Sequence, residues 1–302
     1  MPVDPEHGAA LRAAGLDPRR VERIGEGWFA VVYRATDRSP DRVVRVLKPE
    51  AATAGWVEGY AREVGLLRRL ERRGLPVPRG AEAIRAADGR LLGTAADFLG
   101  GTPVREVRLS GGARARLARE LAEFLDVLHS TPVAEVRALG IPELDLGTEL
   151  YAPLAEEALP LLRPRGRAWL RARLNEFAAG GGSTRAPRVP IHGDLGGHHV
   201  LSGEDGRLRG VLDFGDALIG DAAFDFAGLL NAFSWRFIDL VLTSYPGPAA
   251  QDADLPRRAA FYIDVAPLYS LVYGVRLGDA RLAAHGRRQL AARAAAATRA
   301  AR

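Results

Sequence analysis

The chain has 302 residues, of which 47% are hydrophobic, and it carries a formal net charge of +5 at pH 7. This length and apolar content predict a sizeable core within one bilobal unit or two closely packed domains. The sequence has no apolar run of transmembrane length, no leading basic region followed by an apolar one, and no cysteine. We therefore expect a soluble, cytoplasmic protein without a membrane partner.

The basic residues are unevenly divided, because Lys48 is the only lysine among 42 lysines and arginines. The arginines are scattered through the expected helices and form no basic stripe interleaved with aromatic residues, so no nucleic-acid partner is expected. Lysine and arginine differ in geometry at phosphate sites. Lys48 is therefore either a functional residue or a chance survivor at an exposed strand end.

The sequence of the N-terminal third of the chain predicts a small sheet and two helices. A short amphipathic helix is expected near residues 5–15, and apolar and polar residues alternate around turns from 21 to 46, as in antiparallel strands. Residues 56–73 have apolar side chains at helical spacing and predict the second helix. Two strand-like pieces follow, at 90–94 and 96–99.

A Gly-Gly-Thr-Pro break after residue 99 predicts a hinge between an N-terminal lobe, residues 1–99, and a C-terminal lobe, residues 100–302. In the second lobe two short strands are expected, at Val200–Leu201 and Gly210–Leu212. The other elements are expected to be helices, at 112–129, 149–162, 167–177, 222–237, 257–275 and 280–297. The predicted fold class is α+β, with a small antiparallel-sheet lobe and a larger, mostly helical one.

Two aspartates nineteen residues apart carry the strongest chemical signal. Asp194 ends the triplet His-Gly-Asp, and Asp213 opens the triplet Asp-Phe-Gly. Loose phosphoryl transfer needs one carboxylate to orient the attacking hydroxyl and another to hold the magnesium ions that bridge the nucleotide phosphates. The pair therefore indicates phosphoryl transfer, although Asp-Phe-Gly alone is also common as a turn at a strand end.

The turn around Gly25 and Gly27 lies between two expected strands, where glycines let backbone amides approach a phosphate chain closely. The following strand brings two cations, Arg45 and Lys48, and Glu63 lies in the next helix, where an ion pair could orient a cation toward the phosphates. Strand parity favours Arg45, whereas composition favours Lys48. A simple hairpin is the alternative interpretation of the two glycines.

Three further acids follow the second motif, at Asp216, Asp221 and Asp225. Carboxylates near an acceptor hydroxyl could steer and hold a cationic substrate, so all three are candidate substrate ligands. Other interpretations are a solvent-facing side chain for Asp216, a helix cap for Asp221, and a backbone contact in the catalytic core for Asp225.

With these motifs the chain resembles the aminoglycoside phosphotransferase family, whose bilobal fold is similar to that of protein kinases. The resemblance runs nearly end to end, and the segments HGDLGGHHVL and GVLDFGDALIGD carry it most specifically. The closest in look are the 2''-aminoglycoside kinases and their macrolide-kinase relatives. The resemblance implies a protein-kinase-like fold and transfer of the γ-phosphate of ATP or GTP to a hydroxyl of a small molecule. A cationic aminoglycoside is the expected substrate, with antibiotic resistance as the implied role.

The resemblance also implies a role for each motif residue. Asp194 would be the catalytic aspartate, with His192 bracing its loop. Asp213 would be the main Mg²⁺ ligand, and His199 falls where many kinases place an asparagine that binds magnesium. Imidazole is a poorer partner than an amide oxygen for a hard ion. The 2''-kinases look to have histidine at this position as well.

The nucleotide base would be read by backbone groups of the strand between the lobes, around Thr94, Asp97 and Leu99. Backbone contacts of this kind do not separate ATP from GTP. The oligomeric state is equally open, since the sequence is compatible with a monomer and with a homodimer.

Two alternatives remain. The acceptor could be a macrolide, choline, homoserine or another metabolite, since an aminoglycoside pocket should be acidic and wet and a macrolide pocket large and apolar. The chain could also be a catalytically inactive nucleotide-binding regulatory protein, because Ala30, Arg45 and His199 stand where kinases have glycine, lysine and asparagine. The two intact motif aspartates argue against loss of catalysis.

Overall fold

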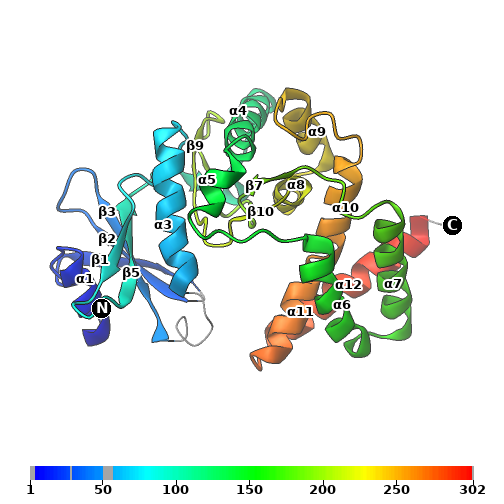
Figure 1. The fold of residues 1–302 in the computed structure, drawn as a ribbon, viewed down its shortest axis with the longest axis horizontal. Helices are drawn as coiled ribbons and strands as arrows, with labels where there is room; N and C mark the ends of the chain where they lie inside the picture. Colours follow the sequence, from blue (N-terminus) through cyan, green and yellow to red (C-terminus); the bar gives the residue numbers. More distant parts are fainter. Residues whose placement is uncertain (1–3, 28, 50–56, 301–302) are drawn as a thin grey trace.

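The computed structural model describes residues 4–27, 29–49 and 57–300. A small antiparallel sheet flanked by helices lies at one end of an elongated molecule, and a larger helical part extends away from it (Figure 1). The expected α+β fold class is confirmed. The lobe boundary after residue 99 stays a prediction.

Five strands form the N-terminal sheet in the order β1-β2-β3-β5-β4, with every neighbouring pair antiparallel. Their bounds are β1 Val21–Glu26, β2 Ala30–Ala35, β3 Arg42–Leu47, β4 Glu82–Arg85 and β5 Leu91–Asp97. The pieces expected at 90–94 and 96–99 are one strand, because β5 pairs with β3 without interruption from Gly93 to Asp97. The alternating pattern did not predict β4, which lies at the edge of the sheet.

The two faces of the sheet carry different helices (Figure 1). Helix α1 (Pro5–Ala13) covers one face and packs Leu11 against Tyr33 and Val44 in a small core. Helix α3 (Val57–Arg72) lies on the other face and contributes its buried leucines to the main core of the molecule. Since β-strand side chains alternate, Arg45 faces α3 while Val44 faces α1.

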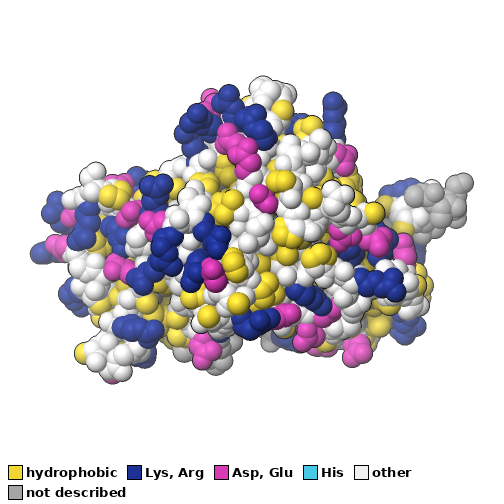
Figure 2. Space-filling view, turned by 45° about the horizontal axis from the view of Figure 1, so that its top comes forward, with side chains coloured by type: hydrophobic (Ala, Val, Ile, Leu, Met, Phe, Trp, Pro, Cys, Tyr) yellow, Lys and Arg dark blue, Asp and Glu magenta, His cyan; other side chains and the backbone are white. Residues whose placement is uncertain are grey.

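The rest of the chain is mainly helical. The helices are α4 Gly111–His129, α5 Val133–Arg137, α6 Ala152–Ala158, α7 Pro164–Ala179, α8 Ala223–Leu229, α9 Trp235–Ser244, α10 Leu255–Val265, α11 Pro267–Arg276 and α12 Ala280–Ala300. No helix within the described residues is long and apolar enough to cross a membrane. On the face drawn in Figure 2, arginines are interspersed with acidic side chains.

Short strands surround the two-aspartate motif, as expected. Strand β7 (Arg188–Ile191) pairs with β10 (Leu218–Asp221). Strands β6 (Thr102–Pro103), β8 (Val200–Ser202) and β9 (Leu208–Val211) form a second small sheet. Each aspartate loop therefore begins at the end of a strand.

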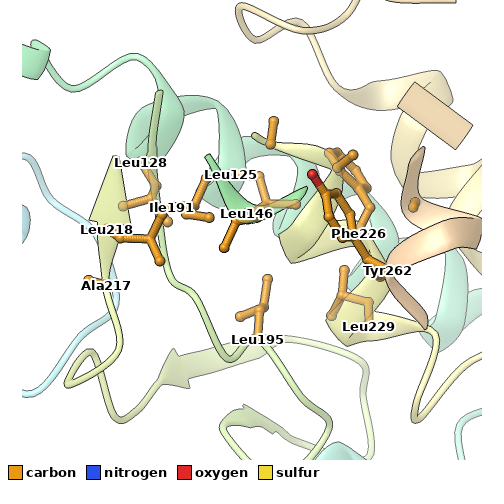
Figure 3. Packing of buried hydrophobic residues seen from close by; sticks show 14 of the residues in the cluster. Leu125, Leu128, Leu146, Ile191, Leu195, Ala217, Leu218, Phe226, Leu229 and Tyr262 are labelled. Atoms are coloured by element: carbon orange, nitrogen blue, oxygen red, sulfur yellow. The ribbon is translucent and has the colours of Figure 1, made fainter. Parts of the chain in front are cut away.

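Buried apolar residues lie directly under these loops (Figure 3). Ile191 and Leu195 are both buried and flank the His-Gly-Asp triplet in the sequence. Ala217 and Leu218 are buried immediately after Asp216. Burial of the residues beside each acid fixes the backbone, while the acids themselves stay at the surface of the core.

Three expected helices are interrupted. The helix expected at 149–162 is a π-helix over Leu146–Tyr151, then α6, then a 3₁₀ turn over Leu159–Leu161. The helix expected at 222–237 is α8 and α9, because the chain turns between them and Ser234 takes an extended N-cap conformation. The helix expected at 257–275 is α10 and α11, separated at Pro267, which has no N–H to continue the first helix. The first residue of the helix expected at 56–73 and residue 28 of the glycine turn lie outside the described residues.

A buried ion pair joins the end of β10 to α10. Arg258 donates from Nε to Asp221 Oδ2 at 2.7 Å and from Nη2 to Asp221 Oδ1 at 3.0 Å, and Tyr262 donates its hydroxyl to the same carboxylate at 3.0 Å. The Asp221 side chain is fully buried and that of Arg258 is 3% exposed. Asp221 also accepts from the backbone N–H of Ala223, the first residue of α8, at 3.0 Å, while the N-cap residue of that helix is Ala222.

Substitution of Asp221 by alanine should lower the free energy of unfolding by about 3–5 kcal/mol, because it leaves the Arg258 charge buried without its main partner. Urea unfolding followed by circular dichroism measures this. Asp254→Asn is the control, since the carboxylate of Asp254 is 62% exposed and its loss should cost no more than about 0.5 kcal/mol. Equal effects of the two substitutions would contradict a stabilising role for the buried pair.

Candidate active site

His192 connects the two aspartate segments. Its Nδ1 accepts a hydrogen bond from the backbone N–H of Asp194 at 3.1 Å, so the ring proton is on Nε2, which donates to the carbonyl of Leu212 at 2.8 Å. The side chain is fully buried. These two contacts hold the loop of Asp194 against the strand end that leads into Asp213, in agreement with the bracing role expected for His192.

Asp225 fixes the backbone of the loop that carries Asp194. Its carboxylate accepts from the backbone N–H of His192 at 2.9 Å and of Gly193 at 3.1 Å. A third donor is His129, whose Nε2 lies 3.2 Å from Asp225 and whose Nδ1 lies 2.8 Å from the hydroxyl of Tyr245.

The substrate-contact predictions for Asp221 and Asp225 are therefore wrong. Both side chains are fully buried and their oxygens already accept hydrogen bonds inside the protein. A carboxylate with no exposed surface cannot meet a substrate. The structure instead shows backbone contacts, from the N–H of Ala223 to Asp221 and from the N–H groups of His192 and Gly193 to Asp225.

Two backbone conformations at the site are unusual. Gly193 has φ +83°, and a Cβ there would lie 2.1 Å from the carbonyl oxygen of Asp216. Only glycine fits this position. Asp213 has φ +63°, the one positive value among the described non-glycine residues. Left-handed backbone in an aspartate at a site of this kind stores strain that the surrounding structure must hold in place.

A buried ion pair joins the sheet to the second aspartate. Arg45 donates from Nη1 to both carboxylate oxygens of Glu63 at 2.8 Å, and from Nη2 to Asp213 Oδ1 at 2.9 Å. Glu63 is 3% exposed and also accepts from the backbone N–H of Phe214 at 3.1 Å. The expected ion pair between Glu63 and a strand cation is confirmed, and its cation is Arg45.

Lys48 lies elsewhere. Its Nζ donates to the carbonyl of Gly27 at 2.9 Å and forms an ion pair with Glu26. Gly25 lies within β1, and the N–H of Gly27 donates to the carbonyl of Ala30 at 2.8 Å, so the glycine turn closes a hairpin. Lys48 therefore stabilises the glycine turn, whereas Arg45 forms the ion pair with Asp213.

The electrostatics follow from these contacts. Burial favours the uncharged form of Arg45, yet the charges of Glu63 and Asp213 raise its pKa above the ordinary value. Burial works to raise the pKa of Asp213, but the charge of Arg45 and its hydrogen bond lower it below the usual range. Asp213 is thus held as a carboxylate.

His199 faces Asp213 across a short gap. Its Nδ1 lies 2.8 Å from the backbone carbonyl of Asp194, to which it can only donate, and its Nε2 lies 3.5 Å from Asp213 Oδ2. Burial lowers the pKa of His199, so the ring is neutral at pH 7 and Nε2 presents a lone pair to the carboxylate. Two acceptors facing each other without a proton between them suit a cation. Asp213 and His199 therefore fit the expected magnesium site, although imidazole is a less usual ligand than oxygen.

Asp216 stays accessible to solvent beside this cluster. Partial loss of hydration, with the charges of Asp194 and Asp213, raises the pKa of Asp216 to about 6. Its position is compatible with the substrate contact that the sequence suggested.

The segment expected to read a nucleotide base is partly occupied by internal contacts. Thr94 is buried in β5, and the Asp97 carboxylate accepts from Arg42 at 2.9 Å. The backbone N–H of Asp97 donates to Arg79, and that of Phe98 to Asp41. Within the described chain, the N–H of Leu99 has no such acceptor.

Several residues that shape the site were not expected from the sequence. The Tyr60 ring lies 4.7 Å from the Arg45 guanidinium carbon, and Tyr245 supports Asp225 through His129. His198 lies 3.8 Å from Asp194 Oδ2. The doublet His198–His199, four and five residues after Asp194, was a usable signal, whereas nothing in the sequence connects Tyr245 with residue 129.

Comparisons with known proteins agree with this arrangement. The sequence model of the Phosphotransferase enzyme family matches residues 20–298. Among solved structures, APH(2'')-IIIa in complex with GDP and kanamycin is 26% identical, covers 91% of this chain and 93% of its own, and has a TM-score of 0.79. The GDP complex of wild-type aminoglycoside 2'-phosphotransferase-IIIa is 24% identical over 91% of this chain and 92% of that chain, with a TM-score of 0.78.

A third solved structure is that of an enzyme whose name gives it another class of antibiotic, the macrolides. Macrolide 2'-phosphotransferase MphH from Brachybacterium faecium is 23% identical over 90% of this chain and 91% of that chain, with a TM-score of 0.66. No curated protein matches the chain.

Substitution of Arg45 by lysine should weaken binding of Mg²⁺-ATP or Mg²⁺-GTP by about tenfold or more, because one ammonium cannot keep the bidentate contact with Glu63 and also reach Asp213. Titration with a fluorescent nucleotide measures the affinity. Lys48→Met is the matched control and should change the affinity less, since Lys48 contacts the hairpin. The assignment is wrong if Lys48→Met has the larger effect.

Proposed function

The chain belongs to the Phosphotransferase enzyme family, as its motifs predicted, and from this membership we propose that it transfers the γ-phosphate of ATP or GTP to a hydroxyl of an aminoglycoside-like substrate. One observation carries the proposal. Asp194 presents a half-exposed carboxylate, 49% accessible, on a loop held by His192 and Asp225, beside the Asp213 that Arg45 holds in place.

The residues divide the work of the transfer. Asp194 orients the acceptor hydroxyl and accepts its proton as the hydroxyl oxygen attacks the γ-phosphorus, while the bond to the bridging oxygen breaks and the nucleoside diphosphate leaves. Arg45 contacts the phosphates with the N–H groups that Glu63 and Asp213 leave free. Asp213 and His199 would hold Mg²⁺, which supplies neutralisation of the phosphate charge when bound.

The donor nucleotide would lie between the sheet and the helical part, with residues 1–99 and 100–302 as the two lobes. The backbone of Leu99, whose N–H donates to no acceptor in the described chain, is the group we assign to the base. The two aminoglycoside phosphotransferases named above were solved with GDP, which supports use of a purine nucleotide without choosing between ATP and GTP. The proposal keeps the cytoplasm as the expected location of the reaction.

The proposal of a cationic acceptor rests on the negative charge of the site. Asp216 adds a second accessible carboxylate beside Asp194, and aminoglycosides are polycations. Relatives of this fold were solved with kanamycin and gentamicin, which supports the same class here.

A macrolide is the second candidate acceptor. On α11 the rings of Tyr269 and Tyr273 stack with centroids 4.8 Å apart, and Tyr269 is 38% exposed. Burial, the Tyr273 hydroxyl and the charge of Asp216 raise the pKa of Tyr269. An exposed aromatic surface suits a large apolar ligand, and two macrolide phosphotransferases share the fold.

The substitution Asp194→Asn should abolish most transfer, with a loss of about 10²–10⁴-fold in kcat, because an amide cannot take the hydroxyl proton. Mass spectrometry of aminoglycosides and macrolides incubated with enzyme, Mg²⁺ and either nucleotide identifies the product. Nucleotide binding should be retained in the variant. Nucleotide binding by the unchanged protein without transfer to any acceptor would instead favour another metabolite or the inactive regulatory protein.

For a cationic acceptor, KM should rise as the pH falls through about 6, because Asp216 is ionised above its pKa of about 6 and neutral below it. The expected change is about two- to fivefold, the size of an exposed ion pair. Steady-state kinetics from about one unit below to about two units above this pKa measure it. Asp216→Asn should have a raised KM that does not vary in this window. A similar rise of KM in that variant would assign the pH dependence to another group.

A further inference from the structure

The catalytic loop carries a histidine, His198, that the proposed transfer does not use. We propose that Asp194, His198 and His199 form a binding site for a divalent transition-metal ion, with Zn²⁺ as the best-fitting ion, and that this ion occupies the catalytic carboxylate. The site itself follows from the geometry. Only its inhibitory consequence rests on the proposed function.

The three side chains already lie close to a metal-binding arrangement. One ligand atom from each lies within 4.8 Å of the others. His198 Nε2 is 3.8 Å and His199 Nδ1 is 3.6 Å from the same oxygen, Asp194 Oδ2. Zinc bonds of about 2.0–2.1 Å in a tetrahedron place neighbouring ligand atoms about 3.4 Å apart. Rotation of the His198 and Asp194 side chains, which are 43% and 49% exposed, would bring the three ligand atoms together.

The loop sequence explains why His198 reaches this position. Gly196 has no side chain, and a Cβ there would lie 2.5 Å from His198 Cε1 and 2.7 Å from its Nδ1. The ring therefore folds back over Gly196 toward Asp194, with its centroid 3.8 Å from that of His199. The His198 side chain is 43% exposed, so an ion can enter from solvent.

The donor set selects the metal. Two imidazole nitrogens and one carboxylate oxygen suit Zn²⁺ and other late first-row ions, whereas Mg²⁺ prefers oxygen ligands and retains water. Three protein ligands leave a fourth position for water. The set differs from the proposed magnesium ligands, Asp213 and His199, in containing His198 and the catalytic aspartate.

His199 belongs to both sites through different nitrogens. With its proton on Nδ1, donated to the Asp194 carbonyl, Nε2 is available on the Asp213 side. Zinc at Nδ1 must replace the hydrogen bond to the Asp194 carbonyl, and it requires the proton on Nε2, where Asp213 Oδ2 at 3.5 Å would accept it. A carboxylate on the second nitrogen is the usual support of a ligating histidine. Because one neutral ring offers one lone pair, the two sites exclude each other.

The test is a calorimetric titration of metal-free protein, without a histidine tag, with Zn²⁺ alone. The unchanged protein should bind one equivalent. His198→Asn should bind at least about tenfold more weakly, since even loss of an outer partner of a ligand typically costs about 10–100-fold. His285→Asn is the matched control, because His285 is exposed on α12, away from the site in sequence, and contacts Gln289. It should bind like the unchanged protein.

Equal zinc affinity of His198→Asn and the unchanged protein would overturn the proposal, as would a loss of binding in the His285 control. Retained nucleotide binding and thermal unfolding of His198→Asn show that the variant is folded. Where an acceptor is phosphorylated, Zn²⁺ should inhibit transfer by the unchanged protein at concentrations that leave His198→Asn active. If no acceptor is phosphorylated, the proposed function is wrong. The zinc titration still tests the proposed metal site in that case.

Discussion

The Arg45 guanidinium is the contact on which the rest of the site depends. It joins three segments that are distant in the sequence: β3, α3 through Glu63, and the turn of Asp213. A planar fork can serve two carboxylates at once, whereas an ammonium is a point charge. Glu63 is nearly buried, and its desolvation is offset by Arg45 and by the N–H of Phe214. The sheet and the second aspartate are therefore positioned by one shared set of charges.

Asp225 does for the first aspartate what Glu63 does for the second. A buried carboxylate with three donors fixes the backbone of His192 and Gly193, and so the direction of Asp194. Neither buried acid is placed to meet a ligand. Each buried carboxylate fixes the geometry of its loop, because displacement of the loop would leave the buried charge without its hydrogen-bond donors.

The sequence predicted what local pattern determines. The strands around the two aspartates, the parity that turns Arg45 toward α3, and the pairing of a strand cation with Glu63 all follow from spacing over a few residues. The resemblance to a known family added the fold class. Together, local spacing and the family resemblance named Arg45, Glu63 and Asp213, which the structure brings into contact.

The missed features depend on contacts between distant segments. Asp221 and Asp225 look like surface acids until Arg258 and His129 are placed beside them, which no local periodicity reveals. The helices expected at 222–237 and 257–275 kept a helical apolar pattern through residues where the chain turns. Periodicity shows which residues are buried, but the turn is decided by packing between helices and by a proline that cannot donate.

The contact of Gly193 with the carbonyl of Asp216 has a consequence for how the protein can diverge. The loop that carries Asp194 and the turn that carries Asp216 touch through bare backbone, so neither can move or gain bulk without displacing the other. Under the proposed function, the residue that takes the hydroxyl proton and the inner edge of the acceptor site would therefore change only together. New acceptor preferences would then arise through Tyr269 and Tyr273, whose side chains can be exchanged one at a time.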